Sequence, residues 1–180
     1  MTRYVAFLRA INVGGRTVSM DRLRTIVAGV GVDRVETFIA SGNVVFESRA
    51  GAATLAPRIE GALRDALGHD VAAFLRTDAE VAAIAARAAF PAEAVARAGA
   101  QVVALLASPL SKAGVRALAG LRTDVDDFAV HGAEVYWLCR TRQSQSTFSN
   151  QVFERRVGVP ATFRSVTTLQ RLSAKYPPRG

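Results

Sequence analysis

The 180-residue chain has few residues of several types, and each shortage excludes a class of protein. Cys139 is its only cysteine, so no disulfide can form within the chain. His69 and His131 lie far apart, and neither has a carboxylate or thiol at metal-ligand spacing. No apolar run approaches the roughly 18 residues of a membrane span, and residues 1–4 lack the pattern of a signal peptide. The sequence therefore predicts a cytoplasmic protein without a metal, a cofactor or a membrane span.

Acidic residues are scarce toward the end of the chain. Residues 140–180 hold eight basic residues and one acidic residue, whereas residues 50–139 hold eight and ten. This excess favours anionic partners such as phosphates, nucleic acid or acidic metabolites. A solvated basic surface in an arginine- and alanine-rich chain is the other interpretation, and both stay open. Nothing in the sequence predicts the oligomeric state.

The chain does contain an internal repeat. Five residues of a predicted hairpin recur ninety positions later: Val35, Phe38, Gly42, Val45 and Phe46 match Val125, Phe128, Gly132, Val135 and Tyr136. At the same offset Gly68, which ends a predicted helix, recurs as Gly158. Glycine at such positions permits the positive φ that turns and helix ends require. The repeat predicts that one supersecondary unit occurs twice.

The spacing of apolar residues predicts the elements of both copies. Predicted strands lie at 4–10, 34–40, 44–47 and 71–76, and again at 102–107, 126–131, 134–140 and 161–164. Predicted helices lie at 20–30, 55–67, 111–121 and 148–157, with a further helix at 166–175. Ser19 is the expected N-cap of the first helix, and Thr77–Glu80 forms a capping box that opens a connecting helix.

This order, strand-helix-strand-strand-helix-strand, is that of the ferredoxin-like or split βαβ unit. The sequence thus predicts an α+β protein of two ferredoxin-like units packed into one compact body. The predicted divisions are a first unit at 1–76, a helical connection at 77–100 and a second unit with a C-terminal helix at 101–180.

Three segments resemble a known family. FLRAINVGG at 7–15, SGNVVF at 41–46 and FSNQVFERRVGVPAT at 148–162 are similar to the signature segments of a bacterial family called domain of unknown function 1697. The resemblance implies a duplicated ferredoxin-like architecture and carries no established activity. The chain departs from the family pattern at four positions: Ala10 stands where glycine is usual, Thr147 where lysine is usual, and Ser165-Val166 where Asn-Trp is usual.

The first candidate site lies where the first strand ends. In a split βαβ unit this end and the turn between the next two strands meet at one edge of the sheet. Glycines allow close approach of a ligand to the backbone, and the following helix N-terminus favours an anion. The predicted ligand-binding residues are Arg9, Asn12, Gly14, Gly15, Ser41 and Asn43. Plain turn chemistry at the glycines and asparagines is the alternative.

Arg9 is a charge at the end of a buried strand, so it must leave the core, pair or meet a ligand. An ion pair with Glu47 and contact with a ligand are both open.

The second candidate site is the helix that begins near Asn150. Asn150 and Glu154 are four residues apart and share a helical face. The predicted ligand-binding residues here are Asn150, Glu154, Arg155 and Arg164, which are expected to close the first site from the second half. An ordinary helix cap with a solvated face is the alternative.

The leading functional hypothesis is a binding protein for a small anionic ligand bearing phosphate or carboxylate. One alternative is an enzyme that uses Glu154 as acid or base, with its reaction and remaining catalytic residues unknown. Another is a nonspecific nucleic-acid-binding module. Cys139 is expected to be a packed core thiol beside Trp137, and Asp124, Asp126 and Asp127 are expected at a solvated edge.

Overall fold

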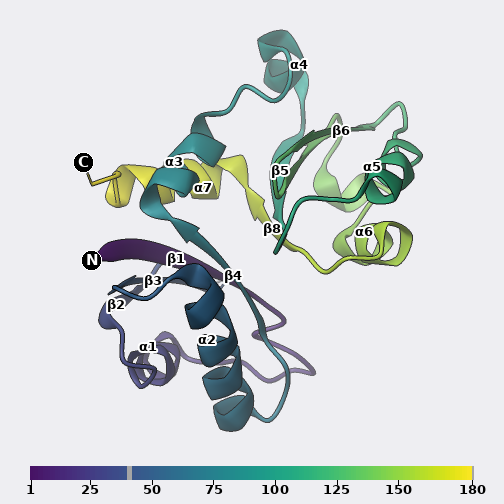
Figure 1. Ribbon diagram of the computed structural model, residues 1–180. Helices are drawn as coiled ribbons and strands as arrows, with labels where there is room; N and C mark the ends of the chain where they lie inside the picture. The colour runs from purple at the N-terminus through teal and green to yellow at the C-terminus, as the bar shows by residue number, and fades with distance from the viewer. Residues whose placement is uncertain (40–41, 180) are drawn as a thin grey trace. The chain divides into compact units, whose positions relative to one another are not determined.

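A computed structural model describes residues 1–39 and 42–179 of the chain (Figure 1). The fold divides into two compact units. Unit 1 contains residues 1–82 and the last segment of the chain from Leu172, and unit 2 contains residues 83–171. The predicted boundaries at residues 76 and 100 were drawn from the internal repeat, whereas this division reflects compactness, so those boundaries stay a prediction. The packing of the two units into one body also stays a prediction.

Unit 1 is a four-stranded antiparallel sheet with two helices, in the order β2-β3-β1-β4. Its strands are β1 (Thr2–Arg9), β2 (Asp33–Thr37), β3 (Asn43–Ser48) and β4 (Ala72–Thr77). Its helices are α1 (Met20–Ala28) and α2 (Ala52–Leu67). Ser19 caps α1 as predicted, because its hydroxyl accepts a hydrogen bond from the Arg22 amide at 3.2 Å.

Unit 2 repeats this topology in the order β6-β7-β5-β8. Its strands are β5 (Ala100–Leu105), β6 (Asp126–His131), β7 (Glu134–Cys139) and β8 (Thr162–Ser165). Its helices are α5 (Lys112–Ala119) and α6 (Asn150–Val157), and a short 3-10 turn, η1 (Gln143–Gln145), precedes α6. The two sheets with their helices confirm the predicted α+β fold and the duplication.

Three further helices belong to the segments around these sheets. They are α3 (Asp78–Ala86), α4 (Ala92–Arg97) and α7 (Val166–Lys175), and the division between the units falls within α3 and α7. The capping box at the start of α3 is confirmed: the Thr77 amide donates to Glu80 Oε2 at 2.7 Å and the Glu80 amide donates to Thr77 Oγ1 at 3.1 Å. No helix in the described ranges is both long enough and apolar enough to span a membrane.

In each unit one face of the sheet forms a core with the two helices. Alternate strand residues point to this face because successive side chains in a strand point to opposite sides. In unit 1 the core joins Tyr4, Ala6 and Leu8 of β1 to buried leucines and isoleucines of α1 and α2. In unit 2 the core contains Trp137 and Cys139, so the prediction for the lone thiol is confirmed.

The hairpin repeat needs one correction. The Leu8 amide donates to the carbonyl of Gly42 at 2.9 Å, and the Leu106 amide donates to that of Ala133 at 2.9 Å. Gly42 therefore corresponds to Ala133 rather than Gly132, and the offset at this turn and in the strand after it is 91 instead of 90. Because side chains alternate, this single step moves Tyr136 to the face opposite that of Phe46. The structural counterpart of Phe46 is Trp137, which pairs with β5 as Phe46 pairs with β1.

Unit 1 also has a bulge that unit 2 lacks. Asp33 is opposite Glu47 and Glu36 is opposite Val45, so two residues on β2 face one on β3. The extra residue is Arg34, which has a φ of +51°. A left-handed first residue is typical of one class of β-bulge, in which it is usually glycine. The bulge turns the arginine toward the carboxylate of Glu47.

Candidate functional site

The loop after β1 and the turn before β3 meet at one end of unit 1, as the hydrogen bond from Leu8 to Gly42 shows. Gly14 and Gly15 have φ values of +61° and +76°, with open space where a side chain would lie. Asn12 Oδ1 accepts a hydrogen bond from the Val18 amide at 3.0 Å. Asn12 therefore has a structural role in shaping the loop before α1.

Asn43 is fully buried, and its side-chain amide donates to the carbonyl of Phe38 at 3.0 Å, which fastens the turn. Arg9 is half-buried at the end of β1. Of the two alternatives left open for Arg9, the ion pair with Glu47 is wrong, because Glu47 lies opposite Arg3 at the other end of the strand. Ser41 lies outside the described residues. A ligand at this loop and turn stays a prediction.

The second predicted set lies in unit 2. Asn150 Nδ2 donates to the carbonyl of Ala161 at 3.5 Å, and Glu154 Oε1 accepts from the amide of the same residue at 3.1 Å. Asn150 and Glu154 thus share a helical face as predicted, and they hold α6 to the segment before β8. Arg155 is exposed. Their role toward a ligand, and that of Glu154 as an acid or base, stay predictions.

Arg164 is 8% exposed in the middle of β8. Its Nη1 donates to Thr162 Oγ1 and to the carbonyl of Phe163, both at 2.8 Å. Burial lowers the pKa of Arg164 to about 10, because it disfavours the charged form. A site shared by the two predicted sets combines residues of two separate units and also stays a prediction.

The prediction that Asp126 lies at a solvated edge is wrong. Asp126 is 1% exposed and accepts hydrogen bonds from Trp137 Nε1 at 2.7 Å, Ser146 Oγ at 2.8 Å and Thr123 Oγ1 at 3.2 Å. Buried carboxylates require such partners. Asp127 is half-buried and pairs with Arg122 at 3.0 Å. Asp126 therefore fastens the polar segment before α6 to the core of unit 2, and alternation along β6 separates it from Asp127.

A pocket lined by six charged side chains belongs to unit 1. It has a volume of about 380 Å³ on the face of the sheet away from α1 and α2. It lies between the strands and the residues that follow Arg171. We call this pocket the charged cavity. Its lining residues are Arg3, Arg34, Glu36, Val45, Phe46, Glu47, Lys175, Tyr176 and Arg179.

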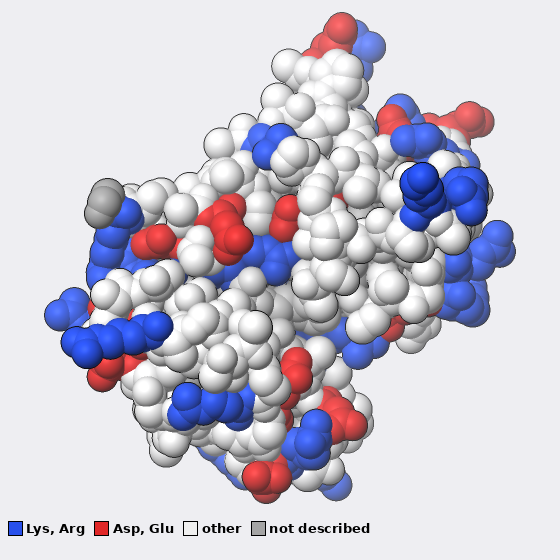
Figure 2. Space-filling view, viewed as in Figure 1, with Lys and Arg blue, Asp and Glu red and all other residues white. Residues whose placement is uncertain are grey.

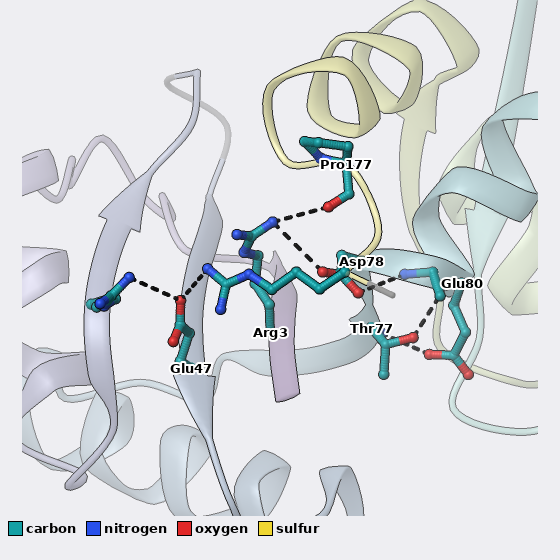
Figure 3. A network of polar contacts seen from close by, with 9 residues as sticks. Arg3, Glu47, Thr77, Asp78, Glu80 and Pro177 are labelled. Carbon is teal, nitrogen blue, oxygen red and sulfur yellow. Dashed lines mark hydrogen bonds and ion pairs between the residues drawn. The ribbon is translucent and has the colours of Figure 1, made fainter. Parts of the chain in front are cut away.

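Glu47 is the central anion of the charged cavity. Its Oε1 accepts a hydrogen bond from Arg179 Nη2 at 2.6 Å and lies 3.9 Å from Arg34 Nη1. Glu47 is 6% exposed, and the hydrogen bond from Arg179 holds its pKa below the usual value. Figure 3 shows Glu47 beside Arg3 on the neighbouring strand. Arg3 Nη1 donates to the carbonyl of Pro177 at 3.1 Å.

A second group in the charged cavity is centred on Tyr176. Its hydroxyl donates to Glu36 Oε2 at 2.6 Å, and Lys175 Nζ lies 3.7 Å from the same oxygen. The tyrosine ring contacts two cations, with Arg3 Cζ at 5.7 Å and Lys175 Nζ at 5.0 Å from its centre. Burial raises the pKa of Tyr176, and the hydrogen bond to Tyr176 raises the pKa of Lys175.

Only part of this cavity could be predicted from the sequence. The basic excess of residues 140–180 includes Lys175 and Arg179, but nothing in the spacing indicates that they return to β1 and β3. Arg3 and Glu47 become neighbours only through strand pairing. Long-range pairing of this kind leaves no local pattern in one sequence.

Exposed basic side chains also gather over α5 and α6 in unit 2 (Figure 2). They include Lys112, Arg116, Arg155 and Arg156, and α5 contains no acidic residue. Over the described ranges, no group of three or more His, Cys, Asp or Glu side chains could hold a metal ion.

The fold defines the class: the molecule is a duplicated ferredoxin-like α+β protein. The chain belongs to the family described as "Protein of unknown function (DUF1697)", whose model matches residues 1–136. The conserved bacterial protein SP0830 from Streptococcus pneumoniae is 22% identical, with a TM-score of 0.73 over 99% of both chains. That likeness supports the fold alone. No curated protein matches the chain.

Proposed function

We propose that the protein binds a small anionic ligand, bearing phosphate or carboxylate, in the charged cavity of unit 1. The supporting observation is the convergence of four basic side chains on one pocket of about 380 Å³. Pockets from about 300 Å³ upward hold small molecules in other proteins. Arg34 and Arg179 come from distant parts of the chain and approach the same carboxylate oxygen of Glu47.

Arg34 is the residue best placed to contact a ligand. Its side chain is 73% exposed, and its nearest carboxylate oxygen among the described residues is that of Glu47 at 3.9 Å, beyond hydrogen-bonding distance. A guanidinium has five donors in a planar fork that matches the oxygens of phosphate and carboxylate. Arg34 can therefore donate to a ligand without breaking a short bond.

The test measures the binding of inorganic phosphate, sulfate and acetate to the full chain. Thermal shift and calorimetry at constant ionic strength are the two measurements. A ligand that binds only the native state raises the apparent stability. Arg34→Asn removes the charge and keeps a residue that tolerates positive φ, so we expect about a tenfold loss of affinity. Arg34→Lys should retain most of the binding, and Arg49→Asn at another exposed position is the matched control.

A second experiment distinguishes binding in the charged cavity from binding at the loop after β1, which was predicted from the sequence. Arg9→Gln removes the charge at the end of β1 and leaves the charged cavity unchanged. Loss of binding in Arg9→Gln with normal binding in Arg34→Asn would move the site to the loop after β1. If the unaltered protein binds none of the three anions at millimolar concentration, the proposal is wrong.

Nonspecific binding of nucleic acid is the second candidate, and the exposed basic residues on α5 and α6 support it. Binding through phosphate contacts must weaken steeply with salt. Arg155→Gln combined with Arg116→Gln should reduce both the affinity for single-stranded RNA and the slope of log affinity against log salt. Absence of RNA binding at 50 mM salt would exclude this function.

A further inference from the structure

The segment from residue 172 to residue 179, which we call the C-terminal strap, lies across the charged cavity. It begins as the last turn of α7, where the Tyr176 amide donates to the carbonyl of Leu172 at 2.8 Å. Pro177 and Pro178 then end the helix, because proline lacks an amide hydrogen and fixes φ. The strap is therefore a short and stiff segment rather than a flexible tail.

Each polar link between the strap and the strands ends on a residue that lines the charged cavity. Tyr176 and Lys175 reach Glu36 on β2, and Arg179 reaches Glu47 on β3. The carbonyl of Pro177 accepts from Arg3 on β1. The Tyr176 ring also lies edge-on to Phe38, which follows β2 and is outside the cavity lining, with 6.2 Å between ring centres. Movement of the strap would therefore open one wall of the cavity.

We propose that the C-terminal strap is the closing element of the anion site, and that Glu47 occupies the position of the ligand's anionic group in the free protein. This inference rests on the proposed function. An incoming anion takes the place of Glu47 on Arg179 and Arg34, and it joins the strap to the sheet in the same way that Glu47 does. Strap position and ligand occupancy are then coupled.

The geometry around one atom supports the exchange. Oε1 of Glu47 accepts from Arg179 and also faces Arg34, so two guanidinium groups from different segments converge on one oxygen. That is the environment that phosphate and carboxylate oxygens occupy in arginine-lined sites. The guanidinium of Arg3 has other partners, since it binds Pro177 and lies 3.6 Å from Asp78 Oδ2 (Figure 3). Arg34 and Arg179 are therefore the pair that would exchange Glu47 for a ligand.

The alternative is that the strap is only a structural fastening, with Glu47 as its permanent anchor. In that case an added anion has nothing to replace. The two alternatives differ in what happens when the carboxylate is removed. Glu47→Gln removes the negative charge that Arg179 pairs with and so loosens the strap, and only an anion site can restore that charge from solution.

The Lys175–Tyr176 bond provides a natural reporter. Tyr176 is buried, so trypsin can cut after Lys175 only when the strap opens. In the full chain, we expect Glu47→Gln to be cut at this bond about tenfold faster than the unaltered protein, as followed by mass spectrometry. Addition of inorganic phosphate should slow this cleavage to near the original rate, whereas chloride at equal ionic strength should not.

Glu36→Gln is the matched control. It also loosens the strap, because a neutral amide replaces the carboxylate that accepts from the Tyr176 hydroxyl and pairs with Lys175, but it leaves Glu47 on Arg179. Phosphate should therefore slow cleavage much less in Glu36→Gln than in Glu47→Gln. Equal protection in the two variants would mean general stabilisation by phosphate and would overturn the exchange. If Glu47→Gln does not fold, Arg179→Gln replaces it, with fast cleavage that phosphate does not slow.

The outcomes separate this inference from the function on which it rests. If calorimetry shows phosphate binding to the unaltered protein but phosphate leaves cleavage of Glu47→Gln unchanged, the strap coupling is wrong and the anion site stands. If neither protein binds phosphate, both are wrong.

Discussion

Units 1 and 2 have the same topology, yet the sheet faces turned away from their own helices carry different chemistry. In unit 1 this face pairs Arg3 with Glu47 across β1 and β3. The corresponding pair in unit 2 is Gln101 and Leu138. The backbone of the duplicated unit has thus been retained while the row of charges occurs in one copy. The comparison indicates that the fold is set by the helix-covered face, whereas the charged cavity depends on the other face.

Features that control backbone geometry are the same in both copies. Ser19 and Ser111 each cap the first helix of their unit, accepting an amide hydrogen bond at 3.2 and 3.1 Å. Gly68 and Gly158 each end the second helix with φ of +76° and +83°. One buried charge is also duplicated, because Arg76 and Arg164 occupy the same place on β4 and β8 and are each 8% exposed.

Asp126→Ala in unit 2 should give the largest effect, because its carboxylate is buried and accepts hydrogen bonds from three side chains. The change leaves the Trp137 Nε1–H and two hydroxyls without their acceptor. Each buried unsatisfied group costs about 1–3 kcal/mol, so we expect a loss of roughly 3 kcal/mol in the free energy of unfolding. Urea denaturation measures it. Asp127→Ala, next along β6, is the control and should cost less than about 1 kcal/mol.

Glu47→Gln tests the charge row of unit 1. We expect a loss of roughly 1–2 kcal/mol at pH 7, since the charged acceptor of the partly exposed Arg179 side chain becomes a neutral amide. The pKa of Glu47 is lower in the folded protein than its ordinary value of 4.5. Its stabilisation is therefore complete above that value and disappears as pH falls through the lower folded pKa. The stability difference between the two proteins should shrink as the pH falls below about 4.5; a constant difference down to pH 2 would contradict the ion pair.

Gly68→Ala and Gly158→Ala test what the units share. In both places a methyl group would meet nothing within 4 Å, so only the positive φ opposes alanine. We expect each change to lower the free energy of unfolding by about 1 kcal/mol, and by equal amounts. Gly61→Ala in the middle of α2 also has open space and should have the opposite sign. Unequal effects at the two helix ends would show that one of them has further contacts.

Ala10→Gly should give the smallest effect, and a favourable one. Ala10 has a φ of +60°, the conformation that glycine adopts without steric cost. Unit 1 therefore contains the alanine with some backbone strain. We expect a gain of roughly 0.5 kcal/mol, because relief of the left-handed strain exceeds the added freedom of the unfolded chain. The change in melting temperature measures it, and a decrease would refute the strain.

The sequence predicted the fold well because the signals for helices and strands are local. Apolar spacing located the strands and helices of both units, and Ser19 and Gly68 marked helix ends through backbone chemistry. The repeat was wrong by one residue at Gly42, because residue types matched at offset 90 while the pairing of β3 and β7 follows offset 91. A one-residue step reverses the face of a strand side chain, and composition alone does not reveal it.

The candidate site was less accessible to sequence reasoning. Asn12 and Asn43 were recognised as special positions, and both make hydrogen bonds that shape turns. Arg34 gave no signal because a bulge depends on the partner strand, which brings two residues of β2 opposite one of β3. Arg179 was recognised only as part of a basic segment, since its contact with Glu47 joins residues 132 positions apart.

The return of the chain to unit 1 has a consequence for how this unit is made. The strands of unit 1 are complete by residue 77, but Tyr176 and Arg179 leave the ribosome almost a hundred residues later. During synthesis Glu36 and Glu47 of the first sheet therefore stay hydrated, without Tyr176 and Arg179, until unit 2 has been translated. A gene fragment that stops before Leu172 would encode a sheet without its final layer, so the two halves cannot be produced as independent, intact proteins by a single cut in the sequence.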